Sequence, residues 1–415
     1  MPTRNQILAA MQFDHIQAFL PLNTRGGQPY EITYQFAGNS QPGNAIWSYN
    51  GWTPFTNAQK NAVRAVLTQV ETFLNVDFVE VRGDPDADLD FGRVNASGWA
   101  GQGGLWLQGS TNNPNYDGQV VFDRTFDLLG WEGTHVIVHE VGHALGLDHP
   151  FEGSVLPAAF ENNHYTVMSY TSDPHSGVRN DSMMLYDILA LQDIWGAASH
   201  ANGNTVYNGR GNQDVRVVWD TGGIDTFNAA TAANRVELDL RPGRFSTFGT
   251  YEDVAVAYGV RIENAIGSRY SDLIQGNREN NLLQGRNGHD RIIGDAGNDR
   301  IFGQGGNDVL IGGSGHDVLL GSVGRDALNG GTGNDAMRGQ DGADTFVFRA
   351  GYDRDRILDF TDDVDRIRII GEGTRAQVLA QADEVNGHVR FNFGDGDILI
   401  VLNTTINELR DDLIV

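Results

Sequence analysis

The chain of 415 residues contains no cysteine, which excludes disulfides, thiolate zinc sites, cysteine nucleophiles and thiol redox switches together. It also lacks any run of 18 apolar residues, so we expect no transmembrane helix. Basic residues are scarce: 29 lysines and arginines face 54 aspartates and glutamates, for a formal net charge of −25. So acidic a chain is not expected to bind nucleic acid or an anionic membrane. The acidic excess fits either simple solubility or the binding of hard cations through carboxylates.

The N-terminal sequence does not have the form of a Sec-type signal peptide, because Gln12, Asp14 and His15 interrupt its apolar stretch. The length and an apolar content of 40% predict about two packed domains. Composition changes near residue 200, so we place the domains at 1–198 and 199–415. Residues 1–20 are interpreted as either a propeptide or a docked N-terminal helix.

The first domain mixes helical and strand patterns. Apolar spacing predicts helices over 57–74, 131–145 and 184–195, and short strands over 31–36 and 119–122. The segment 98–107 is either a strand beside the site described below or a surface loop. A group of acidic residues is expected to begin as a solvated loop, where Pro85 disfavours helix; it comprises Asp84, Asp86, Asp88 and Asp90.

The second domain contains nine consecutive nine-residue repeats over residues 267–347. The eighth position is apolar in every repeat, and the sixth is aspartate in all but one, Asn281. In the last seven repeats the fourth position is always glycine. A flexible linker would keep this composition but not this phase. The pattern is the G-G-x-G-x-D-x-U-x unit of calcium-binding RTX repeats.

Each repeat predicts a glycine-rich turn followed by a short strand with one inward apolar side chain. Because one repeat makes half a coil, each lies above the next but one, and aspartates 18 residues apart come together. Carboxylates and turn carbonyls would then supply the oxygen ligands that Ca²⁺ prefers, and the coil should be largely unfolded at low calcium. The expected calcium ligands in the repeats are Asp290, Asp299, Asp308, Asp317, Asp326, Asp335 and Asp344.

The segment 139–149 fits the pattern H-E-x-x-H-x-x-G-x-x-H, for which the chance of a random match in this length is on the order of one in ten thousand. His139 and His143 are four residues apart and share one face of a helix. Gly146 can reverse the chain and bring in His149 as a third nitrogen. Three neutral imidazoles leave the zinc ion its full positive charge, which lowers the pKa of a water bound to it. Glu140 is placed to take the proton from that water.

This segment, followed by Thr166-Val-Met168-Ser-Tyr170, resembles the metzincin zinc proteases, and more narrowly the serralysin family of secreted bacterial metalloendopeptidases. The resemblance also rests on three further segments. They are the last residues of the following helix, 187–196, the segment Val260–Gly267 before the repeats and the C-terminal Asp-Leu-Ile-Val. It implies an α+β zincin or metzincin catalytic domain followed by an all-β parallel β-roll of RTX type. Two departures put substrate preference in doubt: Tyr186 stands where the family usually has an acidic residue, and the stretch from His149 to Met168 is short.

The resemblance implies one catalytic Zn²⁺ held by His139, His143 and His149, with Glu140 as general base. Tyr170 would be a further zinc ligand in the resting enzyme and would stabilise the oxyanion during attack. Several structural Ca²⁺ ions are implied, and a further calcium site falls on Asp220, Gly222 and Asp225, although this short motif is weak by itself.

The similarity further implies protein or peptide substrates, an extracellular location and export by a type I secretion apparatus that reads a signal at about 360–415. The similarity is also compatible with a protein inhibitor as a partner. We expect a monomer. Two rival readings stay open. One is a calcium-binding RTX surface or adhesion protein with a vestigial protease domain. The other is a zinc hydrolase that acts on a different amide, such as one in a cell wall.

Overall fold

A computed structural model describes residues 1–23, 27–96, 98–110, 113–177, 179–209, 216–249, 251 and 253–415. The chain divides into two compact units. The first is Met1–Asn202 with Gln213–Thr221, and the second is Gly203–Asn212 with Gly222–Val415. Among the described residues, no helix has both the length and the apolar character needed to cross a bilayer.

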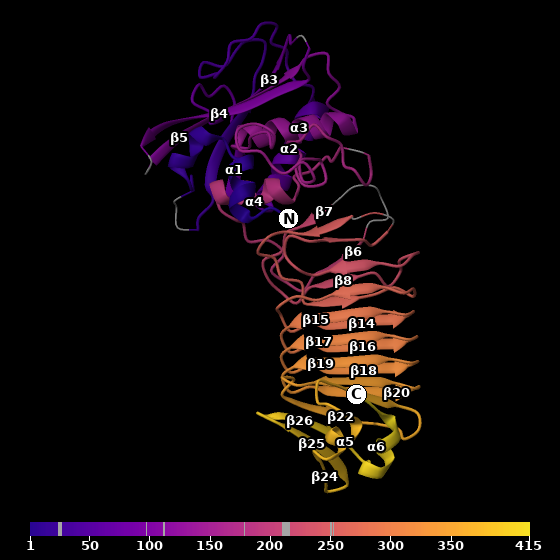
Figure 1. Ribbon diagram of the computed structural model, residues 1–415. Coiled ribbons are helices and arrows are strands. Elements are labelled where there is room, and N and C mark those ends of the chain that lie inside the picture. Colours follow the sequence, from indigo (N-terminus) through magenta and orange to yellow (C-terminus); the bar gives the residue numbers. More distant parts are fainter. Residues whose placement is uncertain are drawn as a thin grey trace. The chain divides into compact units, whose positions relative to one another are not determined.

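The first unit, coloured from indigo to magenta in Figure 1, is built on a five-stranded sheet of order β2-β1-β3-β5-β4. Its strands are β1 (Tyr30–Phe36), β2 (Val76–Glu80), β3 (Leu89–Val94), β4 (Gly101–Ser110) and β5 (Asn113–Asp123). All neighbours are parallel except β4, which runs antiparallel to β5. The glycine-rich segment for which a loop was the alternative is therefore a strand, and it lies at the edge of the sheet.

Three longer helices accompany the sheet: α2 (Asn57–Glu71), α3 (Trp131–Ala144) and α4 (Leu185–Trp195). Each starts within one residue of the expected position. Helix α2 starts at a capping box made by Thr56 and Gln59 and ends at Glu71, earlier than expected, and Leu74 beyond it forms an antiparallel bridge with Ala197. Gly146 follows α3 with φ of +113°, the left-handed conformation that reverses the chain.

The N-terminal segment packs onto this framework. It forms α1 (Arg4–Met11) and a 3₁₀ helix, η1 (Asp14–Phe19), and α1 lies against α4. Ile7, Met11 and Ile16 are fully buried. The backbone N–H of Asp148 donates to the carbonyl of Met11 (2.9 Å), so the segment is bonded to the turn that follows α3.

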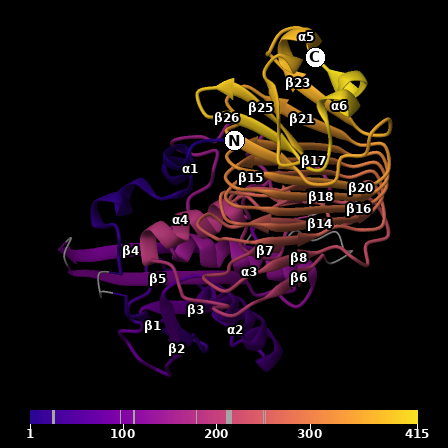
Figure 2. The same ribbon diagram turned by 90° about the horizontal axis from the view of Figure 1, so that it is seen from below.

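The second unit is a parallel β-roll in which successive strands alternate between two sheets (Figure 2). One sheet runs β24-β25-β26-β22-β20-β18-β16-β14-β12-β8-β6 and the other β27-β23-β21-β19-β17-β15-β13-β9. Repeats pair at a spacing of 18 residues, as Ile292 with Leu310 and Ile301 with Leu319, so each lies above the next but one as expected. The strands through the end of the repeats are β6 (Val206–Asn208), β8 (Thr226–Asn228), β9 (Glu237–Asp239), β12 (Asn264–Ile266), β13 (Leu273–Gln275), β14 (Leu282–Asn287), β15 (Arg291–Ala296), β16 (Arg300–Gly305), β17 (Val309–Ser314), β18 (Val318–Val323), β19 (Ala327–Thr332), β20 (Ala336–Asp341) and β21 (Thr345–Arg349).

Further elements lie outside the repeats. A short antiparallel pair is formed by β10 (Phe245–Ser246) and β11 (Val254–Val256), while β7 (Arg216–Val218) belongs to the first unit. The C-terminal part completes the roll with β22 (Arg354–Ile357), β23 (Arg366–Ile370), α5 (Arg375–Leu379), β24 (Ala382–Val385), β25 (His388–Gly394), β26 (Asp397–Val401), α6 (Ile406–Asp412) and β27 (Leu413–Ile414). The region expected to carry a secretion signal is thus folded, and that role stays a prediction.

The apolar eighth positions form one continuous core. All nine side chains are 0% exposed, and they are Ile274, Leu283, Ile292, Ile301, Leu310, Leu319, Leu328, Met337 and Phe346. The invariant fourth glycine has a steric cause. At Gly306, φ is +131° and a Cβ atom would lie 1.6 Å from the carbonyl oxygen of Gly288 in the coil below. Only glycine lets coils stack this closely.

Truncating one rung of this core should destabilise the second unit. Leu310→Ala is expected to cost about 2–5 kcal/mol of unfolding free energy, because both coils around it are close-packed and cannot collapse into the cavity. Denaturant unfolding of the full chain, with calcium present, measures it. Val323→Ala is the control, since Val323 is 59% exposed in the same roll and should change stability by less than about 0.5 kcal/mol.

The docked N-terminal segment should stabilise the first unit. Ile7→Ala is expected to cost about 2–5 kcal/mol, whereas Asn5→Ala, on the exposed side of α1, should stay within about 0.5 kcal/mol. Thermal unfolding compares the two variants. If residues 1–20 were instead a dispensable propeptide, removing them would leave stability unchanged or raise activity, and either result contradicts a docked helix.

Candidate functional site

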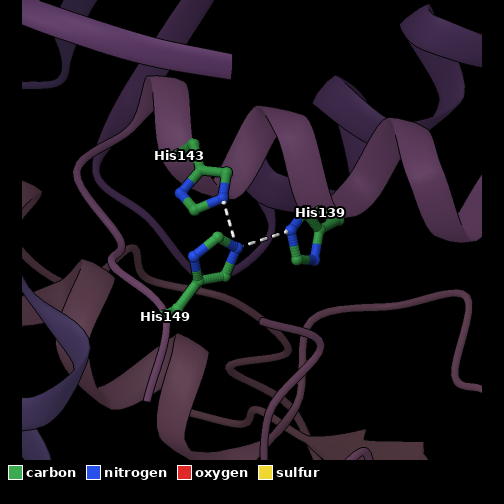
Figure 3. Close-up of side chains that lie close together, drawn as sticks. All are labelled: His139, His143 and His149. Carbon is green, nitrogen blue, oxygen red and sulfur yellow. Dashed lines mark hydrogen bonds between the residues drawn. The ribbon is translucent and has the colours of Figure 1, made fainter. Parts of the chain in front are cut away.

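Three histidines converge at the end of α3 (Figure 3). His139 and His143 project from successive turns of the helix, and His149 returns after the reversal at Gly146. The Nε2 atom of His149 lies 3.1 Å from Nε2 of His143 and 3.3 Å from Nε2 of His139. The sequence pattern therefore brings together the three side chains that it singled out.

The opposite nitrogen of each ring holds that ring in place. Nδ1 of His139 donates to the carbonyl of Val167 (3.0 Å), and Nδ1 of His143 donates to the carbonyl of Leu147 (2.8 Å). Nδ1 of His149 faces Oε1 of Glu152 at 3.2 Å. With the proton on Nδ1, each Nε2 lone pair points toward the shared centre.

The rings of His139 and His143 are held in the neutral form that binds metal. Burial lowers the pKa of His139 to about 3, and burial together with the neighbouring histidines lowers the pKa of His143 well below its usual value. Three imidazoles whose Nδ1 atoms are engaged elsewhere are the donor set of a catalytic zinc site with an open fourth position. The residues present fit zinc.

Glu140 lies beside this centre and is packed against strand β4. It is 8% exposed, and a Cβ atom at Gly103 would lie 2.0 Å from the carbonyl oxygen of Glu140, so a side chain there would exclude the helix. Burial raises the pKa of Glu140 to about 8, while the backbone N–H of Gly103 acts in the opposite direction. The glycines of β4 thus let the helix approach the edge strand and place a proton-accepting group there.

A buried turn supports the histidines from below. Met168 is fully buried, and its sulfur lies where a side chain at Gly142 would go, on the helix that carries His139 and His143. Asp187, at the start of α4, accepts hydrogen bonds from the hydroxyl of Thr166 (2.6 Å) and the N–H of Val167 (2.8 Å). Because Val167 also accepts from His139, Asp187 ties α4 to a metal-ligand candidate.

Tyr170 reaches the same centre from the solvent side. Its hydroxyl lies 2.8 Å from Nε2 of His149, and its ring stacks on His139 with centroids 5.6 Å apart. The residue is 56% exposed, so it can move without disturbing the core. His135, one turn before His139, points elsewhere: its Nδ1 bonds the carbonyl of Asn180 at 2.6 Å.

The centre opens into a cleft of about 810 Å³ between β4 and the turn after α3. Phe13 and His15 of the N-terminal segment line it, and Phe13 stacks on His143 with centroids 5.9 Å apart. Trp47, from the loop before α2, lines it too. These residues were not found from the sequence, since no local motif connects them with residues more than 90 positions away.

The repeat aspartates form two columns along the roll. The backbone N–H of each aspartate donates to Oδ1 of the aspartate one coil further on, as from Asp290 to Asp308 (2.8 Å) and from Asp299 to Asp317 (2.8 Å). In every predicted repeat ligand the other oxygen, Oδ2, is buried without a hydrogen-bond partner; these are Asp290, Asp299, Asp308, Asp317, Asp326, Asp335 and Asp344.

These orphaned oxygens fit a calcium site. A Cβ atom built at Gly285 would meet both Oδ2 of Asp290 and the carbonyl oxygen of Gly303, so carboxylate and carbonyl oxygens crowd one place. Burial raises the pKa of Asp290 and of Asp299 to about 7. Asp355, outside the nine repeats, joins the column, because its Oδ1 accepts from the N–H of Asp335 (3.1 Å) and its Oδ2 is also unpartnered.

The further calcium motif falls at the division between the units. Asp220 is in the first unit, whereas Gly222 and Asp225 are in the second. Both aspartates are buried. Calcium binding by these three residues stays a prediction.

Comparison with known proteins is consistent with this geometry. The family described as Matrixin matches residues 43–180, and the family described as Peptidase M10 serralysin C terminal matches residues 190–398. Serralysin of Proteus mirabilis is 30% identical over 296 residues, covering 60% of each chain. Serralysin of Photorhabdus laumondii is 29% identical over 284 residues, covering 60% of this chain and 59% of its own, and serralysin B of Dickeya chrysanthemi is 29% identical over 290 residues, covering 60% and 59%.

The chain thus spans about three fifths of the length of the curated relatives it matches. A solved structure, the extracellular lipase LipA from Serratia marcescens, is 16% identical over 38% of this chain and 41% of its own, with a TM-score of 0.20 that is too low to bear on the fold. The matched families follow one another along the chain in the order of the two units. The expected fold class, a metzincin catalytic domain followed by a parallel β-roll, is confirmed, and the chain belongs to the serralysin family.

Proposed function

We propose that this protein is a zinc-dependent endopeptidase that cleaves protein substrates outside the cell. The observation that carries the proposal is the convergence of three histidines, with Nε2 of His149 3.1 Å from Nε2 of His143 and 3.3 Å from Nε2 of His139, beside a buried glutamate in an open cleft. Zinc held by His139, His143 and His149 would polarise a substrate carbonyl and lower the pKa of a water in the open position.

Glu140 would then take the proton from the attacking water and return it to the leaving amine. Burial raises the pKa of Glu140 to about 8, so its carboxylate accepts a proton more readily than that of an exposed glutamate. The hydroxyl of Tyr170, which borders the centre as a resting ligand would, can donate to the developing oxyanion. Met168 and Asp187 would act only by fixing the rings.

The edge strand β4 would bind the substrate backbone. Its outer side has no partner strand among the described residues, and it runs along the cleft from Gly101 to Gln108. An extended peptide can add to such an edge through main-chain hydrogen bonds, with alternate side chains entering the cleft. This favours proteins and peptides over other amides as substrates.

The second unit would bind several calcium ions through the repeat aspartates and fold on leaving a calcium-poor cytosol, which fits export in unfolded form by a type I secretion apparatus. A monomer is proposed, and a protein inhibitor would bind across the same cleft. An RTX adhesion protein with an inactive first domain would share this second unit but would not hydrolyse peptides.

Removing the general base tests the mechanism. Glu140→Ala should lower kcat/KM for a casein-derived peptide by about 10²–10⁴, because the proton acceptor is lost while the three histidines remain. Zinc content, measured by elemental analysis, should stay near one per chain. Glu132→Ala, an exposed glutamate in the first turn of the same helix, is the matched control and should keep wild-type activity.

Other outcomes would assign the protein differently. If Glu140→Ala hydrolysed peptides like wild type, the proposed chemistry would be wrong. If wild type bound zinc and left every peptide intact, an inactive first domain or another amide substrate would be the better assignment.

Stability of the second unit should depend on calcium and pH together. Burial raises the folded-state pKa of Asp290 and Asp299 to about 7, above the value near 4 of an exposed aspartate. Without calcium, these groups therefore favour the folded roll at low pH and progressively lose that contribution as pH rises from about 4 to 7. Calcium binds the ionised carboxylates, so millimolar calcium should restore the roll above pH 7.

Circular dichroism of the full chain during urea unfolding, in chelator at pH 5 and pH 8 and in calcium at pH 8, measures this. We expect the urea midpoint of the roll in chelator to be lower at pH 8 than at pH 5. Calcium should raise that urea midpoint at pH 8. Equal stability in all three solutions would contradict the calcium assignment.

A further inference from the structure

The sheet face that lies away from α3 carries an unusual set of buried acids. The acidic group of Asp84, Asp86, Asp88 and Asp90 begins as a loop, as expected, and its last member, Asp90, lies on strand β3 and is 1% exposed. Asp90 pairs in register with Gln35 of β1 and Gln119 of β5, so a polar row crosses three strands. Alternation along β5 puts Asp117 on the same face as Gln119.

Much of this row has no hydrogen-bond partner of good geometry among the described residues. That holds for both carboxylate oxygens of Asp90, Nε2 of Gln119 and Oδ1 of Asp117. Burial raises the pKa of Asp90 to about 7, with the Gln35 amide acting against it and the charge of Asp117 adding to it. Burial and the charge of Asp88 raise the pKa of Asp117 to about 6. One buried and one half-buried carboxyl with so little compensation favour the approach of a cation.

Asp117 differs from the other carboxylates in the cleft because it alone keeps a buried oxygen without a partner. Glu152 faces the ring of His149, Asp148 accepts from the N–H of His149, and Glu140 is bonded by Gly103. No lysine or arginine is found among the described residues that line the cleft. The positive charge has to come from the occupant of the cleft.

Two indole rings flank the approach to Asp117. Trp106 of β4 is its direct cross-strand partner, so both side chains emerge on one face, and Trp106 is 55% exposed. Trp47 covers Gly104, two residues earlier on the same face, and would lie 2.5 Å from a Cβ there. A planar guanidinium can stack on an indole while it bonds a carboxylate, which an ammonium group does less well.

We propose that Asp117, Trp47 and Trp106 form a specificity subsite for an arginine side chain of the substrate, a conclusion that rests on the proposed peptidase function. Gly103 of β4 packs against Glu140. Trp106 follows Gly103 by three residues on this strand, which is about 10 Å at strand spacing. For a peptide antiparallel to β4, this places the arginine about three residues N-terminal to the bond that is cut. Its guanidinium would lie beside the Trp47 ring that covers Gly104.

Peptides with arginine at each position around one cleavable bond test the subsite, each matched by a peptide with neutral, isosteric citrulline. At one position N-terminal to the bond, wild type should show a kcat/KM ratio of arginine to citrulline of about ten or more, as for a charge-assisted hydrogen bond. Asp117→Asn should bring that ratio close to one. Asp77→Asn is the control: it removes an exposed charge from β2, at the opposite edge of the same sheet, and should keep the wild-type ratio.

A second variant tests the subsite in case the Asp117→Asn protein does not fold. Trp106→Leu changes a half-exposed side chain and should lower the arginine ratio several-fold while circular dichroism stays that of wild type. A wild-type ratio near one at every position, or a ratio that survives in Asp117→Asn, would overturn the subsite.

Measuring peptide binding without hydrolysis distinguishes the arginine subsite from the peptidase function. Calorimetry with the Glu140→Ala protein and the same peptide pairs measures discrimination without hydrolysis. If wild type cleaves nothing but the Glu140→Ala protein still binds the arginine peptide about tenfold more tightly, the peptidase function fails and the subsite stands. If peptides are cleaved but neither assay prefers arginine, the subsite fails and the function stands.

Discussion

The first unit depends on making three imidazole lone pairs meet at one point. A helix alone can align only His139 and His143, so the third ring requires a reversal that returns the chain within six residues. Gly146 makes the reversal with a positive φ, and the side chains of Ile16 and Ile194 leave no room for a Cβ there. The same reversal exposes backbone groups that the N-terminal segment satisfies, because Met11 and Phe13 bond to it.

Support for the rings is distributed through the fold rather than confined to the helix. The carbonyl that fixes His139 belongs to Val167, whose own N–H is held by Asp187 at the start of α4. Asp187 is fully buried, and burial raises its pKa to about 7 although three hydrogen-bond donors act to lower it. Holding a partly uncompensated acid in the core costs stability, and it fixes the turn that carries Met168 and Tyr170.

What the sequence could reveal depended on how local each interaction is. The three converging histidines lie within eleven residues and the repeats have a fixed phase, so both could be predicted, including the 18-residue pairing and the apolar core from Ile274 to Phe346. The positions of Phe13 and Trp47 in the cleft depend on packing between distant segments, and nothing near them in sequence signals it. The burial of Asp90 could not be predicted for the same reason, because it follows from strand pairing with Gln35 and Gln119, which its acidic neighbours in sequence do not signal.

The two aspartate columns of the roll extend beyond the last nine-residue repeat. What joins one aspartate to the next is a hydrogen bond from a backbone N–H to Oδ1, and this bond needs vertical stacking rather than a fixed number of residues per coil. It therefore continues from Asp335 to Asp355 across 20 residues and from Asp344 to Asp365 across 21, where inserted loop residues break the repeat but not the stack. Each repeat aspartate from Asp290 to Asp344 uses one oxygen to hold the coil before it, which leaves the second for the proposed calcium ion. Without the ion, that second oxygen would be buried and without a partner, and the cost would recur at each of these coils. The proposed coupling would therefore link ion binding to folding along the roll rather than at one site.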